Sequence, residues 1–145
     1  MRYRKGIFFV VYKKEKKNLY LILKRKLHWR GWEFPKAGLK KGEINKETVK
    51  RELKEETGLR AEKIKDFKTR GKWRYTERLR DRPGMIGQTW HLYGVEISKG
   101  KVRIDKKEHS AYRWLPYKEA LKILTWPNQK RCLKIVNSCI KNGKF

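Results

Sequence analysis

The chain has 145 residues, which is long enough for one domain with a hydrophobic core and too short for two ordinary domains. Its 41 Lys and Arg exceed its 15 Asp and Glu, which gives a formal net charge of +26. This charge predicts affinity for polyanions such as nucleotides or RNA. The alternative is that all proteins of the source organism are basic. Six Trp, seven Tyr and five Phe argue against disorder, and no apolar segment is long enough to span a membrane.

Two strands are predicted near the N-terminus. Residues 6–12 and 19–23 are apolar, β-branched or aromatic, and the polar segment KKEKKN separates them, as in a hairpin or two neighbouring strands. The basic start and short apolar run superficially resemble a signal peptide. However, the run lacks a small-residue cleavage site and ends in a lysine cluster, so a strand is predicted. Residues 25–43, RKLHWRGWEFPKAGLKKGE, are expected to form a loop.

The clearest predicted helix covers residues 46–57. Asn45 is a suitable N-cap, the intervening residues are good helix formers, and Gly58 ends the helix with Leu59 placed to fold back on the last turn. After it we predict strands at 67–75 and 88–97, a long basic loop between them, a short strand at 112–115, and helices at 117–124 and 128–141, the second opened by Pro127. Strands first and last with helices between and after them predict an α/β or α+β fold with a mixed sheet.

The two cysteines are expected to be free thiols. Cys132 and Cys139 lie two helical turns apart, or roughly 10 Å, which is too far for a disulfide. We therefore expect a reducing, cytoplasmic environment. The histidines are His28, His91 and His109, and their spacing with the cysteines does not suggest a zinc site.

Three carboxylates are concentrated in RELKEETGL, residues 51–59, of this very basic chain. On a helix, Glu52, Glu55 and Glu56 are neighbours, while Val49 and Leu53 occupy another face suited to packing on a sheet. Like charges at this spacing cost roughly 0.2 to 0.5 kcal/mol per pair unless a cation lies among them. A hard divalent ion such as Mg²⁺ fits, because it takes oxygen ligands and also binds phosphates. The alternative is a solvated helix face paired with its own basic neighbours.

The acids belong to a longer pattern. Seven residues separate Glu43 from Arg51, and the sequence from Arg51 onward reads R-E-L-K-E-E-T-G-L. This resembles the Nudix box, G-x5-E-x7-R-E-U-x-E-E-x-G-U with U aliphatic, in every element but the first. Ala37 stands where the box has Gly, and Gly38 follows. The box Gly permits an unusual backbone turn, so either Ala37 strains the loop or Gly38 supplies its flexibility.

The resemblance implies a Nudix fold, an α/β/α sandwich with a mixed central sheet, that hydrolyses a nucleoside diphosphate linked to another group. It also implies that Glu52, Glu55 and Glu56 hold one or more Mg²⁺ or Mn²⁺ ions, that Arg51 orients the first Glu, and that Glu43 supports the site. Metal ions neutralise a polyphosphate, lower the pKa of a bound water and hold the attacking and leaving oxygens in line.

Three further stretches are similar to the diadenosine polyphosphate hydrolases and bacterial RNA pyrophosphohydrolases: WEFPKAGLKKGE, IGQTWHLYGVEI and EHSAYRWLPYKEAL. In that branch Glu108 corresponds to an additional metal ligand or general base, and Arg4 to a phosphate-contacting arginine. Their alternatives are an ordinary loop acid and a surface residue of a basic N-terminus. Lys36 is expected to project toward the phosphates, although its identity does not decide between the subclasses.

An aromatic face is expected to recognise the base, since stacking tolerates any base. Trp126 matches the position of a stacking aromatic, and Tyr75 or Trp73 could form a second wall; the alternative for Trp73, Trp90 and Trp114 is core packing. The segment KWRYTERLRDR, residues 72–82, could follow a phosphate backbone or be a solvated basic loop.

We therefore expect a Mg²⁺-dependent pyrophosphohydrolase acting on diadenosine tetraphosphate or a 5'-triphosphate RNA end. The alternatives are another Nudix hydrolase, for ADP-ribose or damaged nucleoside triphosphates, and a non-catalytic RNA-binding module. Binding-only relatives tend to lose the box glutamates, whereas here Glu52, Glu55 and Glu56 are all present. Nothing in the sequence indicates the oligomeric state.

Overall fold

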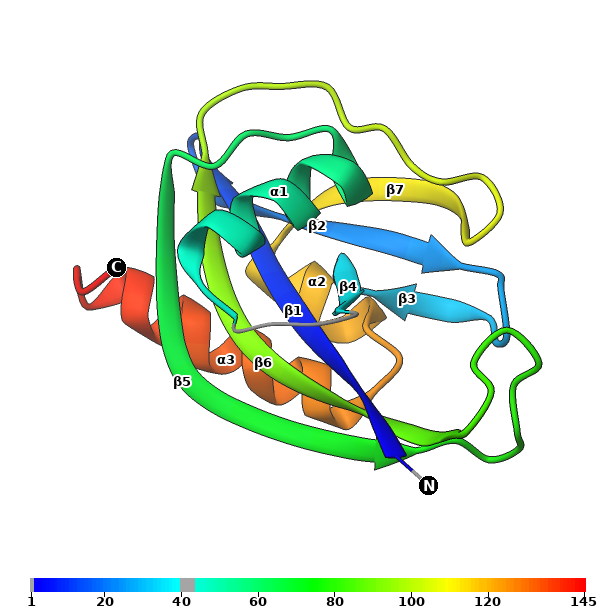
Figure 1. Ribbon diagram of the computed structural model, residues 1–145. Coiled ribbons are helices and arrows are strands. Elements are labelled where there is room, and N and C mark those ends of the chain that lie inside the picture. Colours follow the sequence, from blue (N-terminus) through cyan, green and yellow to red (C-terminus); the bar gives the residue numbers. More distant parts are fainter. Residues whose placement is uncertain (1, 40–43) are drawn as a thin grey trace.

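The computed structural model describes residues 2–39 and 44–145, which form a mixed sheet with helices on both faces (Figure 1). The strands and helices, in chain order, are β1 (Arg2–Lys14), β2 (Asn18–Arg25), β3 (Gly31–Glu33), β4 (Lys36–Leu39), α1 (Lys46–Thr57), β5 (Lys63–Arg74), β6 (Met85–Ile97), β7 (His109–Pro116), α2 (Tyr117–Ile123) and α3 (Pro127–Lys141).

Strand β1 is the centre of the sheet. One of its edges pairs in parallel with β6, which in turn pairs with the antiparallel strand β5. Its other edge is shared, because β2 pairs only with Tyr12–Lys14 while β4 pairs with Lys5–Phe8. The strands β1 and β2 therefore diverge, and β3 pairs with the far end of β2 while β7 covers its outer edge. The short strands β3 and β4 fill the resulting wedge.

The prediction of a loop over residues 25–43 was wrong, because it contains β3 and β4. These strands have only three and four residues. Segments of this length are too short to show the alternation of apolar and polar residues that predicts a strand. They become strands through backbone pairing with the longer strands β1 and β2. The strand predicted from residue 67 begins earlier, at Lys63, and a register shift between Asp66 and Arg70 interrupts its pairing.

The continuous apolar run of β1 is explained by burial on both faces of the sheet. Phe9 and Val11 pack with Val49 and Leu53 of α1 in one core. Phe8 and Val10 face the opposite way, into a second core that includes Ala120 of α2 and Leu133 of α3. The predicted α/β/α sandwich is thus confirmed.

Helix α1 begins and ends as predicted. The Asn45 side chain accepts a hydrogen bond of 2.9 Å from the backbone N–H of Thr48. Gly58 adopts the left-handed φ of 76° and donates its N–H to the carbonyl of Lys54, and Leu59 behind it is buried. These caps fix the helix that carries the acidic cluster.

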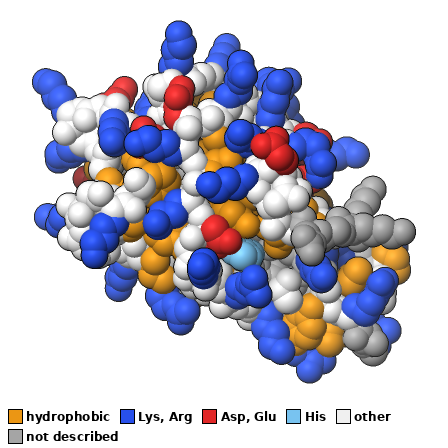
Figure 2. Space-filling model, turned by 60° about the vertical axis from the view of Figure 1, so that its left-hand side comes forward, with side chains coloured by type: hydrophobic (Ala, Val, Ile, Leu, Met, Phe, Trp, Pro, Cys, Tyr) orange, Lys and Arg blue, Asp and Glu red, His pale blue; other side chains and the backbone are white. Residues whose placement is uncertain are grey.

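Cys132 and Cys139 are free, as expected. Within residues 2–39 and 44–145, no helix is both long and apolar enough to cross a membrane. Figure 2 shows one face of the molecule, on which Lys and Arg side chains clearly outnumber Asp and Glu.

Candidate active site

Helix α1 and the loop before β7 bring carboxylates together. Burial, followed by the negative charges of Glu108 and Glu52, raises the pKa of Glu56 to about 8, although Arg25 opposes the shift. The side chain of Glu52 is 15% exposed and that of Glu108 is 25% exposed. Three predicted site residues from two distant segments therefore face one another in a half-buried position.

Glu55 lies apart from this group. Its side chain is 61% exposed, and its carboxylate is 3.9 Å from Arg51, whose guanidinium also lies 3.5 Å from Glu52. Arg51 thus contacts the glutamate that the resemblance says it orients. Glu43 lies outside the described residues. Among the residues described, no three His, Cys, Asp or Glu side chains form a closed metal-ligand group, so the carboxylates would have to move toward a bound ion.

Ala37 causes no backbone strain. It is buried, pairs with Ile7 and lies outside the left-handed region, and Gly38 also has an ordinary φ. A methyl group on Gly38 would overlap the guanidinium of Arg4. The glycine at position 38 therefore gives the Arg4 guanidinium room in its present position, and neither alternative suggested by the sequence applies.

A buried ionic network lies beside the carboxylates. Arg25 of β2 contacts Glu33 of β3 and Glu108, each at 3.4 Å. His109 of β7 lies opposite Arg25 in the sheet, and its Nε2 is 2.8 Å from Oε2 of Glu33, the same oxygen that Arg25 contacts. The Arg25 side chain is only 3% exposed. Its contacts with Glu33 and Glu108 fix its position beside the acidic cluster.

Further cations lie next to Arg25. Lys36 of β4 places its Nζ 3.0 Å from Glu33, and burial lowers its pKa while Glu33 opposes the shift. Burial and then Arg82 lower the pKa of Arg4, whereas Tyr75 and Glu108 raise it. Arg4 therefore lies near Glu108, Tyr75 and Arg82. Together with Arg25 and Arg82 these side chains form a cationic layer suited to phosphate groups.

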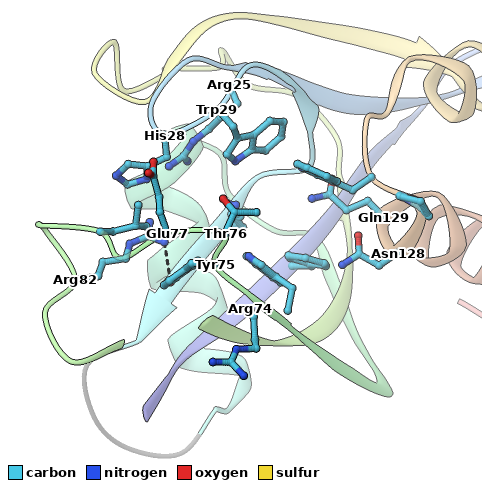
Figure 3. Close-up of a pocket in the computed structure, with 16 residues that line it drawn as sticks. Arg25, His28, Trp29, Arg74, Tyr75, Thr76, Glu77, Arg82, Asn128 and Gln129 are labelled. Carbon is cyan, nitrogen blue, oxygen red and sulfur yellow. Dashed lines mark hydrogen bonds between the residues drawn. The ribbon is translucent and has the colours of Figure 1, made fainter. Parts of the chain in front are cut away.

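An aromatic cavity of about 410 Å³ opens on the other side of the cationic layer. Figure 3 shows Tyr75 and Arg82 joined by a hydrogen bond, in which the guanidinium donates to the Tyr75 hydroxyl at 2.9 Å. The Nζ of Lys36 lies 5.7 Å from the centre of Trp29 and 5.1 Å from that of Trp73. The other lining residues include Phe8, Arg25, His28, Trp126, Asn128 and Gln129.

Trp126 is well placed to contact a ligand in this cavity. It is 43% exposed and meets Trp29 edge to face, with ring centroids 5.1 Å apart. Its segment is fixed to β3 on both sides, since Thr125 exchanges hydrogen bonds with the backbone of Trp32 and the Gln129 side chain accepts from the N–H of Phe34. Trp126 is thus a rigidly held aromatic with an open face.

The other tryptophans that were considered divide between cavity and core. Trp73 packs against Phe8 and also lines the cavity. Trp90 is buried in the core beneath α3, and Trp114 packs against the core beneath α1. A buried acceptor, the Oδ1 of Asn128 at the cavity, has no hydrogen-bond partner among the described residues.

Sequence reasoning did not find Arg25, Glu33, His109 or Trp29, and Arg82 appeared only as part of a basic loop. One signal was present: Leu21, Leu23 and Arg25 are alternate residues of β2, so they share the face that packs toward α1. An arginine continuing an apolar stripe indicates a buried ionic partner. Its partners, Glu33 and Glu108, come from β3 and from the loop before β7, and neither the short β3 nor this pairing could be seen in the sequence.

The chain was compared with known proteins. Residues 2–134 match the NUDIX domain family. An RNA pyrophosphohydrolase of a Nitratiruptor species is 29% identical over 151 residues, which are 99% of this chain and 97% of that protein. Another from Pseudomonas paraeruginosa is 34% identical over 104 residues, 64% of this chain and 65% of that protein. The structure of a C. elegans Ap4A hydrolase binary complex superimposes with a TM-score of 0.76 at 18% identity, covering 96% of this chain and 98% of that one.

Proposed function

The chain belongs to the NUDIX domain family, and from this premise we propose that it hydrolyses a pyrophosphate bond in a nucleoside polyphosphate with the help of Mg²⁺ or Mn²⁺. The substrate we favour is a 5'-triphosphate RNA end, with diadenosine tetraphosphate as the second candidate. The names of the similar proteins point to these two substrates.

One observation carries the proposal: the carboxylates, the cationic layer and the aromatic cavity follow one another in space. Arg25 joins all three, because it contacts Glu108, approaches Lys36 through Glu33 and lines the cavity. A nucleoside polyphosphate presents the same sequence of groups, with a metal-bound phosphate chain at one end and a flat base at the other. Shape and charge therefore both match this class of ligand.

The carboxylates fit a divalent cation. Burial and then the negative charges of Glu108 and Glu52 raise the pKa of Glu56, and Arg25 offsets this shift only in part. We assign Glu52, Glu56 and Glu108 to holding the ion, with Glu55 joining them by moving from its exposed position. When bound, the ion neutralises phosphate charge and acidifies a water molecule.

The protein's own residues then have separate tasks. Arg51 orients Glu52, and Arg4, Arg25, Lys36 and Arg82 bind the phosphate oxygens and stabilise the charge that develops during phosphoryl transfer. Glu108, held by Arg25, accepts the proton of the attacking water or completes the metal ligands. Trp126 and Tyr75 hold the base, so that the scissile bond is positioned against the carboxylates.

A direct comparison of substrates tests this function. We expect the protein with Mg²⁺ to cleave 5'-triphosphate RNA or diadenosine tetraphosphate in preference to ADP-ribose, and to lose turnover in EDTA. Preferred cleavage of ADP-ribose would assign the chain to another branch of the family. Tight RNA binding without cleavage of any of the three would make it a binding module.

Trp126→Ala is expected to raise KM about 5- to 150-fold, which corresponds to the roughly 1 to 3 kcal/mol contributed by one stacked base. The value of kcat should change less, because the carboxylates and cations remain in place. Steady-state kinetics on the preferred substrate checks this. The matched control is Tyr112→Ala, since Tyr112 is 39% exposed but does not line the cavity. Equal effects of the two substitutions would remove Trp126 from the binding site.

A further inference from the structure

Strand β5 carries a line of basic residues along an exposed part of the sheet. Arg70, Lys72 and Arg74 are exposed and alternate with the less exposed Thr69, Gly71 and Trp73, and Lys68 is exposed at the preceding bulge. Alternate residues of a strand are about 7 Å apart. We call Lys68, Arg70, Lys72 and Arg74 the β5 strip.

Asp66 lies near the β5 strip and interacts electrostatically with Arg70, but its ion pair is with His91. Arg70 donates from its Nε to Nδ1 of His91 at 3.3 Å, which leaves the other ring nitrogen to donate to Asp66 at 2.6 Å. The Nζ of Lys72 lies over the ring of Tyr3, 5.0 Å from its centroid. Among the described residues, no acidic side chain pairs directly with a cation of the strip. These contacts orient two of the cations without cancelling their charge.

The sheet face beneath the strip is partly covered, since Thr89 is half-buried and His91 is buried. Lys72 lies opposite Thr89 and Arg70 opposite His91 on β6, and this half of the face is not among the residues that pack under α1. Figure 2, turned so that the β5 side of Figure 1 comes forward, shows basic side chains spread over this part of the molecule. A flat, positively charged surface of this kind suits an extended polyanion.

The strip leads to the cavity. Its last residue, Arg74, stands between Trp73 and Tyr75, and all three line the cavity. Figure 3 shows Arg74 pointing away from the other labelled side chains. A chain whose first base is held by the aromatic residues would therefore meet Arg74 as it leaves the cavity.

We propose that the β5 strip binds the phosphate backbone of an RNA whose 5' end lies in the cavity, several nucleotides downstream of the bond that is cleaved. This surface rests on the proposed function, because it concerns the same RNA substrate. It requires that longer RNA binds better than short RNA, whereas diadenosine tetraphosphate, which has no downstream backbone, gains nothing from the strip.

The test uses the triple substitution K68Q/R70Q/K72Q, which spares Arg74. For a 12-nucleotide 5'-triphosphate RNA, the slope of log KM against log salt concentration should fall by about 2, because three phosphate contacts to a single strand are lost. The KM for a two-nucleotide triphosphate RNA and for diadenosine tetraphosphate should stay within twofold of the wild type. The control, K118Q/K122Q/K134Q, removes three exposed charges from α2 and α3.

Equal loss of 12-nucleotide binding in both triple variants would show that only total charge matters, and would overturn the proposal. A rise in KM for the two-nucleotide RNA would also overturn it, since the substitutions would then impair binding in the cavity itself. Fluorescence anisotropy with a 12-nucleotide RNA bearing a 5'-hydroxyl measures the affinity for RNA in the absence of hydrolysis. Weaker binding only in the β5 variant supports the strip even if the protein cleaves no RNA, so the two proposals fail separately.

Discussion

Glu56→Gln is expected to lower kcat about a thousandfold, within the range for loss of a group that acts in proton transfer or metal-assisted catalysis. The amide has nearly the same shape but cannot carry the negative charge that a divalent ion requires. The fold should survive, because the amide keeps the size and shape of a side chain that is only half-buried, one turn beyond Leu53 of the core. Turnover on the preferred substrate and the melting temperature are the two measurements.

The pKa of Glu56 adds a second readout. Burial, Glu108 and Glu52 raise the pKa to about 8, so in the metal-free folded protein the carboxyl keeps its proton well above its unfolded value. The stability contributed by this proton is lost as pH rises through 8. In EDTA, the variant should therefore gain stability relative to the wild type as pH rises from about 4.5 to about 8, and gain no more above that pH. Stabilisation of the wild type by Mg²⁺ should increase over the same range, since the ion displaces the proton.

Glu119→Gln is the matched control, because Glu119 is an exposed acid in the first turn of α2. It should leave activity and the Mg²⁺ response unchanged. More than a tenth of wild-type turnover in Glu56→Gln would remove Glu56 from the catalytic group. An unchanged pH dependence in EDTA would show that Glu56 does not face its carboxylate neighbours in solution.

The sequence predicted the parts of the fold that carry their own periodic signal. The caps Asn45 and Gly58 act locally, and the apolar runs of β1 and β2 define buried strands whatever they pair with. The strands β3 and β4 could not be predicted in this way. They exist because β1 and β2 diverge, and this divergence is a property of the assembled sheet.

The residues of the candidate site likewise comprise those with a local signal in the sequence and those that only folding brings together. The carboxylates of α1 were visible because fixed spacing on one helix places them together. Arg25, Glu33 and His109 come from three strands that meet only after folding, so single-strand patterns could not join them. Trp29 was hidden for a similar reason, because its segment becomes a cavity wall only through its contact with Trp126. Lys36 was singled out from the sequence, but its dependence on Glu33 was not foreseen.

That dependence leads to the second large expected effect: Glu33→Ala should destabilise the fold by about 3 to 5 kcal/mol, the usual result of removing one partner from a buried ion pair. Glu33 has no exposed surface, and its loss removes the carboxylate that Arg25, Lys36 and His109 share, which leaves Arg25 with Glu108 alone. Urea denaturation at pH 7 checks the value. The control is Glu47→Ala, since Glu47 is 86% exposed in α1 and should cost far less.

The pH dependence of stability separates the charge of Glu33 from its volume. Burial alone would raise its pKa, but Lys36, the hydrogen bond with His109 and Arg25 outweigh burial and lower it to about 2. Because the folded pKa is depressed, the stabilisation is present above the unfolded value of about 4.5 and is lost as pH falls from there toward 2. Glu33→Gln keeps the side-chain volume and should flatten this part of the curve. If the stability of Glu33→Gln falls at acid pH as much as that of the wild type, Lys36 and Arg25 are held by other groups. Glu33 would then have no role in ordering the cationic layer.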